Sequence, residues 1–424
     1  MTNVVQTLRE RGLLQDVTDP GLEKMLSENK VSVYVGFDPS ADSLHIGHMI
    51  GVMILKHFQL AGHRPIALVG GGTGMVGDPS GRSSERNLLT REQIEVNKAG
   101  LRKILERFID FGQGGALMVD NADWLAPFSF LDFLRDVGKY FRIGDMLAKD
   151  SVKRRLASES GLSFTEFSYM LLQAYDFLHL YRTHNCRVQA GGSDQWGNIT
   201  AGTELIRRAV NGQGDGITTP LLTNSTGEKM GKTADGAVWL SAEKLSPYKF
   251  YQFWIQQEDA SLENLFRKLT LLPLEEIAAI IRKHGEDPSQ RYGQKRLAAA
   301  ITGLVHGREE VAKAEASSQA LFGGTLQNKS DGELQALFAN VPSVEIPRAD
   351  LASGIAAADL LVRANLAVSK SEARRLLEQK GFYLNNSDAP FDPSQKNVTA
   401  ADLASESMMI LRAGKKKYCL VKFV

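Results

Sequence analysis

The chain has few cysteines, no excess of charge of either sign and no long apolar run. Of its 424 residues only Cys186 and Cys419 are cysteines, which excludes a disulfide framework and a cysteine-rich metal site. The 50 Lys and Arg residues balance the 49 Asp and Glu residues, giving a formal charge of +1. This balance argues against polyanion binding over the whole surface, so any contact with nucleic acid is expected to be regional.

Nothing in the sequence predicts a membrane segment. The apolar run at residues 49–55 ends at Lys56, well short of the ~20 residues that a membrane helix needs. The N-terminus mixes Arg9 and Arg11 with Glu10, unlike a signal or transit peptide. We therefore expect a cytoplasmic protein that does not span a membrane.

Short β-branched runs alternate with longer helical patterns as far as about residue 222, which is typical of a parallel α/β sheet. The expected strands are residues 31–35, 65–69, 117–119 and 187–190. Ligands of such sheets bind beyond the carboxyl ends of the strands, where this chain has its Gly, Asp and His clusters. Strand signals fade in residues 246–318, which we expect to be helical. A Gly- and Pro-containing connector with a short helix then leads to a small third domain.

Two short cassettes, far apart in the sequence, together predict a site for the phosphates of ATP. The first, His-Ile-Gly-His at residues 45–48, lies at the mouth of an expected helix, where backbone amides attract anions. The second, Lys-Met-Gly-Lys-Thr at residues 229–233, places two cations on a glycine-containing loop. Alone, the first also fits a surface helix or part of a metal site, and the second fits a solvated loop. The pair in this order is far more specific.

Two other kinds of site fit this region less well. Zinc could use His45 and His48, but the remaining ligands are missing and no acidic residue flanks the pair. The glycines at residues 72–77 formally match a dinucleotide fingerprint, but Pro79 ends any helix that begins there. We interpret them as a glycine floor beneath a small ligand, with Asp78 available for an ammonium group.

A polar stripe marks the expected helix at residues 166–177. Glu166, Tyr169, Gln173 and Asp176 recur at three- and four-residue spacing among mostly apolar neighbours. A solvent-facing stripe is the common explanation, but the flanking positions leave little room for a solvated side. A polar-lined pocket for a small ligand is an equally good interpretation, since buried polar groups need partners.

Two loops add polar groups to this candidate site. Residues 188–198 form a strand-to-loop run whose glycines allow close approach of a ligand, and Asp194 is suited to accept ribose hydroxyl protons. Arg82 and Arg86 lie in a Gly- and Ser-rich loop, where they fit either a mobile phosphate clamp or ordinary solvated arginines.

The C-terminal region combines basic side chains with aromatics. A capping signal at Ser369 begins an expected helix over residues 369–377, and an expected strand follows at residues 381–385. The basic side chains are Lys370, Arg374, Arg375, Arg412, Lys415, Lys416 and Lys417. The pattern suits RNA with exposed bases, and a solvated basic edge explains it equally well.

Taken together, these residues resemble the bacterial tyrosyl-tRNA synthetases, a class I family, nearly end to end. The cassettes at residues 45–48 and 229–233 are similar to the two ATP motifs of the class. Tyr169, Gln173 and Asp176, with residues 191–198, resemble the amino-acid pocket of the tyrosine enzymes in particular. The resemblance implies a Rossmann-like catalytic domain at residues 1–225, the second ATP motif with a helical anticodon-side domain at 226–322, a linker at 323–350, and an α+β RNA-binding domain, similar to a ribosomal protein, at 351–424.

The resemblance also implies the reaction and its substrates. The tyrosine carboxylate attacks the α-phosphorus of ATP, with Mg²⁺ as the counter-ion, and the tyrosyl group then passes from the adenylate to the terminal adenosine of tRNA(Tyr). No protein nucleophile and no structural metal are required. Tyr34 and Asp176 would bind the phenolic hydroxyl of L-tyrosine. The other residues implied to hold tyrosine are Asp78, Tyr169 and Gln173, around the ammonium group, and Gln195.

For ATP the resemblance implies contacts with the ribose, the terminal phosphates and the departing pyrophosphate. Gly36, His48 and Asp194 would surround the ribose, and Ser40 and His45 would contact the terminal phosphates. The residues implied to close over pyrophosphate are Lys229, Lys232, Thr233, Arg82 and Arg86. Asp38, Gly47, Gly192 and Met230 complete the implied ATP site.

The sequence departs from the family at a few positions. The family often has cysteine where Val35 lies, threonine where Ser40 lies, and threonine or proline where Gly51 lies. Val35 cannot donate a hydrogen bond to ribose, whereas Ser40 keeps a hydroxyl. The resemblance further implies a homodimer with a contact around Phe164.

Three alternative functions remain open. They are a tryptophanyl-tRNA synthetase, a synthetase-derived RNA-binding protein without catalysis, and a nucleotidyltransferase of the same superfamily that does not act on tRNA.

Overall fold

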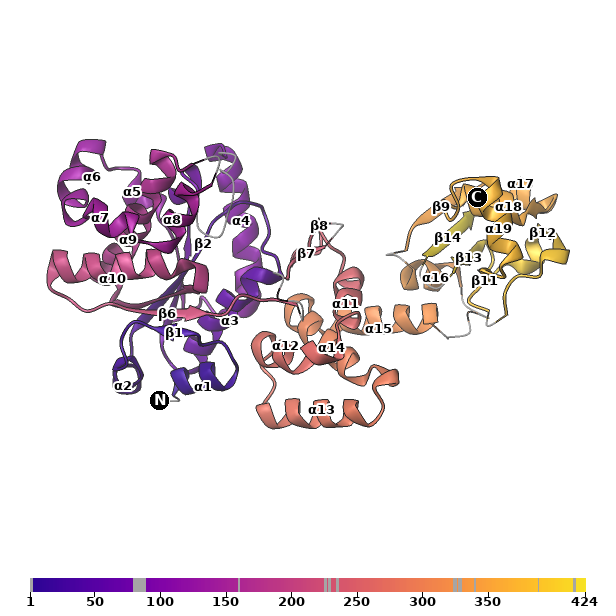
Figure 1. Cartoon of the computed structure of the whole chain (residues 1–424). Coiled ribbons are helices and arrows are strands. Elements are labelled where there is room, and N and C mark those ends of the chain that lie inside the picture. Colours follow the sequence, from indigo (N-terminus) through magenta and orange to yellow (C-terminus); the bar gives the residue numbers. More distant parts are fainter. Residues whose placement is uncertain are drawn as a thin grey trace. The chain divides into compact units, whose positions relative to one another are not determined.

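The computed structural model describes residues 3–78, 89–158, 161–224, 227, 230–233, 236–322, 326, 330–338, 341–387, 389–414 and 417–424, with the backbone alone at 232–233, 319–322 and 336–337. The chain divides into two compact units (Figure 1). The first consists of Met1–Leu245 with Gln252–Val305, and the second of Ser246–Tyr251 with His306–Val424. Each unit is built around a sheet of its own.

A six-stranded sheet, in the order β1-β6-β5-β2-β3-β4, forms the centre of the first unit. Neighbouring strands are parallel, except that β1 pairs antiparallel with β6. The strands are β1 (Asp16–Val17), β2 (Ser32–Phe37), β3 (Arg64–Val69), β4 (Leu117–Asp120), β5 (Cys186–Gly192) and β6 (Asp215–Thr219). The predicted parallel α/β sheet and its four predicted strands are thus confirmed, with ends that differ by one or two residues.

The sequence pattern does not predict β6 or β1. All five residues of β6 are buried, but its Asp-Gly start is of a type depleted in strands. β1 has only two residues and exists through its pairing with β6, in which Val17 lies opposite Ile217. Long-range pairing, which local sequence does not show, creates both strands.

The strand order places a crevice at the carboxyl end of β2. The chain runs from β2 through helix α3 (Ile46–Leu60) to β3 on one side, whereas β5 pairs with β2 on the other side. Connections that leave in opposite directions open a ligand site at this switch point. Gly36 is the one exposed residue of β2, at the end of the strand that faces this crevice.

Two long helices next to the sheet carry site residues. α9 (Phe164–His184) begins with a capping box, in which the Ser163 hydroxyl accepts from the Glu166 amide, and ends at Asn185 in the left-handed conformation. α10 (Trp196–Val210) packs along it. The other helices of this part are α1 (Val4–Glu10), α2 (Leu22–Glu28), α4 (Arg91–Phe108), α5 (Ala122–Leu125), α6 (Phe130–Asp136), α7 (Ile143–Leu147) and α8 (Asp150–Leu156).

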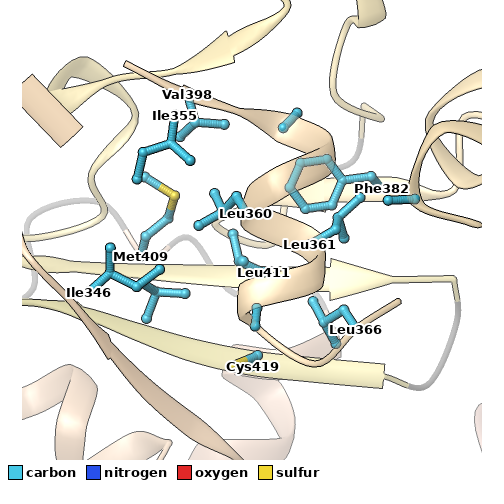
Figure 2. Close-up of a cluster of buried hydrophobic side chains, with 14 of the residues drawn as sticks. Ile346, Ile355, Leu360, Leu361, Leu366, Phe382, Val398, Met409, Leu411 and Cys419 are labelled. Atoms are coloured by element: carbon cyan, nitrogen blue, oxygen red, sulfur yellow. The ribbon is translucent and has the colours of Figure 1, made fainter. Parts of the chain in front are cut away.

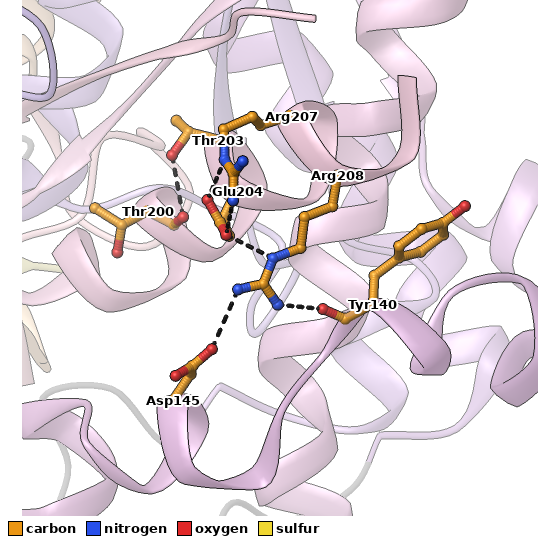
Figure 3. Close-up of polar contacts among 7 residues, drawn as sticks. All are labelled: Tyr140, Asp145, Thr200, Thr203, Glu204, Arg207 and Arg208. Atoms are coloured by element: carbon orange, nitrogen blue, oxygen red, sulfur yellow. Dashed lines mark hydrogen bonds and ion pairs between the residues drawn. The ribbon is translucent and has the colours of Figure 1, made fainter. Parts of the chain in front are cut away.

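Arg208 ties the end of α10 to α7 (Figure 3). Its guanidinium donates to the Tyr140 carbonyl at 2.6 Å, to Asp145 Oδ2 at 3.2 Å and to Glu204 Oε1 at 2.5 Å. Arg207 donates to the same Glu204 carboxylate, whose pKa these two arginines lower to about 2. The pairing holds α7 in place beside α10.

Helices dominate the next region, as predicted. They are α11 (Pro247–Ile255), α12 (Leu262–Leu269), α13 (Leu274–Glu286), α14 (Tyr292–His306) and α15 (Arg308–Phe322). Before them, β7 (Lys232–Thr233), the last two residues of the second ATP cassette, pairs antiparallel with β8 (Gly236–Ala237).

The second unit has a four-stranded sheet in the order β11-β13-β14-β9. Its strands are β9 (Ser343–Ile346), β11 (Phe382–Leu384), β13 (Met408–Ala413) and β14 (Lys417–Phe423), and its helices are α16 (Asp331–Leu337), α17 (Arg348–Ala352), α18 (Ala357–Arg363) and α19 (Lys370–Glu378). A short pair, β10 (Ile355–Ala356) and β12 (Asn397–Val398), completes it. Figure 2 shows Leu360 and Leu361 of α18 packed with Met409, Leu411 and Phe382 in the core.

The expected linker at residues 323–350 needs correction, because part of it belongs to the second unit. β9 lies in this range and pairs in parallel with β14, with Val344 opposite Val421. Leu334 and Phe338 are buried in a cluster with Met408, Ile410 and Leu420. The sequence suggested a connector because β9 is only four residues long and is flanked directly by Pro342 and Pro347. These four residues nevertheless add a strand to the sheet.

No helix in the described part of the chain is long and apolar enough to cross a bilayer.

Gly100 allows α4 to contact the loop that precedes the first ATP cassette. A Cβ atom at this position would overlap the Asp42 carbonyl oxygen, a backbone atom that cannot turn aside. We expect Gly100→Ala to destabilise the first unit by about 1–3 kcal/mol. Gly144→Ala is the control, because the space around that helical glycine is open. Urea unfolding of both variants checks this, and equal midpoints would contradict the close contact.

Candidate functional site

A cavity of about 240 Å³ lies at the carboxyl ends of β2 and β5. It brings together more than half of the residues predicted to bind tyrosine or ATP, from five separate parts of the chain. The predicted residues that line it are Tyr34, Gly36, Asp38, Gly47, His48, Asp78, Tyr169, Gln173, Asp176, Gly192 and Gln195. Ser40, His45, Asp194 and Met230 lie outside this lining. Arg82, Arg86 and Lys229, and the side chains of Lys232 and Thr233, lie outside the described residues.

Tyr34 and Asp176 present a phenol and a carboxyl group to the cavity from opposite elements. Tyr34, on β2, is 1% exposed, and its hydroxyl has no hydrogen-bond partner among the described residues. Asp176, on α9, is also 1% exposed. A buried hydroxyl without a partner is unfavourable unless a ligand supplies one. The pair therefore fits a ligand group that both donates and accepts a hydrogen bond.

Two donors hold the Asp176 carboxylate. The Asn121 side-chain amide donates to Oδ2 at 2.9 Å, and the Trp124 indole donates to Oδ1 at 2.8 Å. Burial raises the pKa of Asp176 to about 7, with help from the charges of Asp38 and Asp120, while the two donors act to lower it. Burial, with the nearby Asp176, also raises the pKa of Tyr34 well above its usual range. Tyr34 is thus a neutral phenol beside a carboxyl group that titrates near neutrality.

Sequence reasoning missed Asn121 and Trp124. Both follow β4, a predicted strand, and so lie at the sheet edge where ligands were expected; that position is the signal that could have found them. Asn121 also accepts from the Gly72 amide at 2.8 Å and donates to Thr73 Oγ1 at 3.0 Å, which links the carboxylate to the glycine floor. Trp124 stacks on His179, one turn after Asp176, with ring centroids 4.3 Å apart.

An amide network lines the other side of the cavity. Gln195 donates to Asp78 Oδ2 at 2.7 Å, and Gln173 donates to Gln195 Oε1 at 3.3 Å. Asn198, the last residue of the run 191–198 that resembles the amino-acid pocket, donates to both Gln173 and Gln195 at 3.1 Å. Because the network fixes each amide by its neighbours, Asp78 and Gln173 offer acceptor oxygens in set positions to a cationic group, and Tyr169 lines the same cavity.

The predicted polar stripe on α9 holds only in part. Tyr169, Gln173 and Asp176 line the cavity, but Glu166 does not. Glu166 reaches back to the start of the helix and forms a buried ion pair with Arg155 of α8 at 2.7 Å. Its position on the stripe therefore reflects capping of the helix and not a pocket.

His45 and His48 cap α3 with their imidazoles. The Gly47 amide donates to His45 Nδ1 at 3.1 Å, and the His45 amide donates to His48 Nδ1 at 3.2 Å. Because each Nδ1 accepts, each neutral ring carries its proton on Nε2. The rings stack with centroids 3.9 Å apart. The helix terminus thus presents two N–H donors of the kind that suits phosphate oxygens.

Backbone hydrogen bonds join the two ATP cassettes. The Ile46 amide donates to the Val238 carbonyl at 3.0 Å, and the Leu240 amide donates to the Leu44 carbonyl at 2.8 Å. The Val238 amide in turn donates to the Gly231 carbonyl at 3.0 Å. Gly231 has φ of 115°, which L side chains rarely adopt. Segments about 190 residues apart in the sequence are therefore adjacent, as one phosphate site requires.

Val35 and Gly51 share one space beside the cavity. A Cβ atom on Gly51 would lie 3.0 Å from Val35 Cγ1 and 3.6 Å from the Phe37 ring. Val35 on the strand is larger than the cysteine that is frequent in the family, and Gly51 on the helix is smaller than the threonine or proline that is frequent there. The two departures from the resembled family are linked by packing.

The predicted RNA-binding side chains lie in the second unit. Arg375 and Lys417 line a hollow of about 170 Å³, and the Arg412 guanidinium lies 3.9 Å from the centre of the Tyr383 ring. Lys370 forms an ion pair with Asp359 at 2.7 Å. Arg374 is exposed on α19, and Lys415 and Lys416 lie outside the described residues.

Comparison with known proteins gives matches over nearly the whole chain. Residues 26–323 match the family model of the class I tRNA synthetases (W and Y), and residues 333–421 match that of the tyrosine–tRNA ligase SYY-like C-terminal domain. The chain is 49% identical to the tyrosine–tRNA ligase of Rhodopirellula baltica over 99% of this chain and 96% of that protein. It is 48% identical to that of Roseiflexus castenholzii over the full length of both.

A solved structure agrees with these matches. The C-terminally truncated mitochondrial tyrosyl-tRNA synthetase of Aspergillus nidulans superposes with a TM-score of 0.69 and 33% identity, over 76% of this chain and 95% of that one.

The raised pKa of Asp176 makes stability depend on pH in a defined direction. Between the usual carboxyl pKa of about 4 and the folded value of about 7, the folded state holds a proton that the unfolded state has lost. Stability due to this group is therefore complete below that window and falls as pH rises through it, by up to about 1.4 kcal/mol per pH unit. Asp176→Asn should lack this fall.

The measurement is urea unfolding of wild type and Asp176→Asn from pH 4.5 to 8.5. Trp124→Phe removes a donor that lowers the pKa, so its fall should extend to higher pH. Parallel curves for wild type and Asp176→Asn would contradict the assignment.

Proposed function

Because this chain belongs to the class I tRNA synthetases of the tryptophan and tyrosine group, we propose that it is a tyrosine–tRNA ligase whose buried Tyr34 and Asp176 select the amino acid. It activates L-tyrosine with ATP, as the magnesium complex, to tyrosyl-adenylate and pyrophosphate. It then transfers the tyrosyl group to the terminal adenosine of tRNA(Tyr). Relatives named tyrosine–tRNA ligases at 48–49% identity over the whole chain support this assignment.

The observation that carries the choice of tyrosine is the unpartnered phenol beside the carboxylate. A tyrosine hydroxyl donates to Asp176 and accepts from Tyr34, which satisfies both buried groups. Phenylalanine would leave the Tyr34 hydroxyl without a partner, at its full desolvation cost, and would give Asp176 no donor beyond Asn121 and Trp124. Tryptophan has a single indole N–H and no acceptor, so it can donate to only one of the two groups and cannot accept from the Tyr34 hydroxyl. The pocket therefore discriminates against both at the binding step.

The amino acid's other end is held by the amide network. Asp78, Tyr169 and Gln173 bind the ammonium group, and Gln195 fixes Asp78 and Gln173 in position. This leaves the tyrosine carboxylate directed toward the glycines of the β2 and β5 ends. An oxygen of that carboxylate forms the new bond to the α-phosphorus of ATP, and the bond from that phosphorus to the pyrophosphate oxygen breaks.

Catalysis consists of positioning and of stabilising charge on the departing pyrophosphate. The Nε2–H groups of His45 and His48 are placed for phosphate and ribose oxygens at the α3 terminus. Gly36, Gly47 and Gly192 would admit ATP close to the backbone, Asp194 would contact the ribose hydroxyls, and Asp38 is a further proposed ATP contact. The remaining proposed ATP contacts are Ser40, Met230, Lys229, Lys232, Thr233, Arg82 and Arg86.

The second unit supplies the proposed tRNA contact. Its basic side chains would bind phosphates, and the Tyr383 ring with Arg412 above it offers a stacking surface for a base. This reaction belongs to protein synthesis, so we place the protein in the cytoplasm.

Amino-acid-dependent exchange of pyrophosphate into ATP tests the proposed function. We expect exchange with tyrosine but not with phenylalanine or tryptophan, and its loss in Asp176→Ala. Asp287→Ala, at a surface carboxylate, is the matched control and should behave as wild type. Exchange with tryptophan in preference to tyrosine would assign the other amino acid. No exchange with any amino acid, from folded protein, would favour an RNA-binding protein without catalysis.

We also propose a homodimer formed through α6 to α9. Seven large apolar side chains are exposed on these elements: Phe130, Leu131, Leu134, Ile143, Leu147, Leu156 and Phe164. Such a cluster is unusual on a monomer surface. α7 carries two of them and is held by Arg208, so the surface is presented by a fixed helix (Figure 3).

Light scattering tests the dimer. Wild type should have twice the mass of one chain at micromolar concentration, and Leu131→Arg should shift it toward the monomer because a charge would be buried in the contact. Val368→Asp is the control, since Val368 is 93% exposed in the second unit, outside the cluster. A monomeric wild type would rule the dimer out.

A further inference from the structure

Trp239 contacts the first ATP cassette at His45 but does not line the cavity. It follows the second cassette and pairs with His45 through an isolated antiparallel bridge. Its ring meets the His45 ring edge-on, with centroids 6.1 Å apart and planes at 62°. The Lys244 ammonium lies 5.2 Å from the centre of the indole and is paired with Asp42 at 2.6 Å.

The His45 ring is constrained by three neighbours. Its Nδ1 accepts from the Gly47 amide, one face stacks on His48, and Trp239 meets it edge-on. The backbone bonds from Ile46 and Leu240 fix where the two segments lie, but they do not fix the side-chain torsions of His45. Removing the indole would open space into which the imidazole can turn, taking Nε2 away from the phosphates.

We infer that Trp239 is a positioning residue for ATP, which holds the His45 imidazole in the orientation that presents its Nε2–H to the phosphates. Lys244, which pairs with Asp42, lies over the indole and supports it weakly. The inference rests on the proposed function, because it gives His45 a phosphate-binding role. It also couples the two cassettes, since movement of the segment after the second cassette reaches His45 through this ring.

The contact of Trp239 with His45 should be stronger than the pairing of Lys244 with Asp42, so substitutions at the two sites should have effects of different size. The Lys244 and Asp42 side chains are 33% and 46% exposed, so solvent screens their pairing and it contributes little. The ring contact with His45 depends on shape and does not weaken with salt. Loss of the indole should therefore matter more than loss of the lysine.

The test is tyrosine-dependent pyrophosphate exchange at varied ATP, with the Kd for tyrosine measured separately by equilibrium dialysis. Trp239→Ala should lower kcat/KM for ATP by about tenfold and leave the tyrosine Kd unchanged. Trp239→Phe keeps a ring and should recover most of the loss. Lys244→Met keeps the apolar stem and should lower kcat/KM by about twofold.

The matched control is Lys283→Met. Lys283 of α13 lies over the Tyr292 ring of α14 in a comparable contact, and its replacement should not change kcat/KM for ATP. Wild-type kinetics in Trp239→Ala, or an equal loss of tyrosine binding, would overturn the positioning role. Should Trp239→Ala not fold, Trp239→Leu, which fills part of the space without a ring, replaces it, and an unchanged kcat/KM for ATP in that variant would overturn the role. Absence of exchange in wild type would instead overturn the proposed function.

Discussion

The site depends on a carboxylate that is buried and therefore needs donors from the protein. A charge removed from water is tolerated only where hydrogen bonds replace its hydration. Asp176 obtains them from Asn121 and Trp124, which the β4 strand delivers to the same sheet edge as β2. Because Asn121 also holds the Gly72 amide, one carboxylate ties together α9, the turn after β4 and the glycine floor. Sheet order, helix position and pocket shape are thus parts of one constraint.

Local sequence predicted the features that repeat or that carry their own chemistry. Strands β2 and β3 were predicted because they are apolar runs. The start of α3 was predicted because the histidines at residues 45 and 48 indicate a helix terminus. Asn121 and Trp124 were missed because an Asn after a strand is ordinary in a turn, and only folding brings it to Asp176, 55 residues away. Glu166 shows the opposite error: its spacing matched the pocket stripe, while its partner Arg155 lies on another helix.

The packing of Val35 against Gly51 shows why single departures from a family are poorly interpreted one at a time. Val35 alone suggests a lost donor to ribose, and Gly51 alone suggests a weakened helix. Because a Cβ atom on Gly51 would come within 3.0 Å of Val35 Cγ1, each choice limits the other. The two residues together decide how one small space between β2 and α3 is filled.

The two ends of the site are stabilised by different physical means. At the amino-acid end, buried side chains satisfy one another, so the geometry is set by hydrogen bonds that water cannot replace. At the ATP end, a glycine with positive φ and a short hairpin carry the second cassette, and backbone bonds to the first cassette set its base. The two ends of the cavity are therefore held by different sets of hydrogen bonds. Tyrosine selection and ATP activation should therefore respond to different substitutions, although both occur in one cavity.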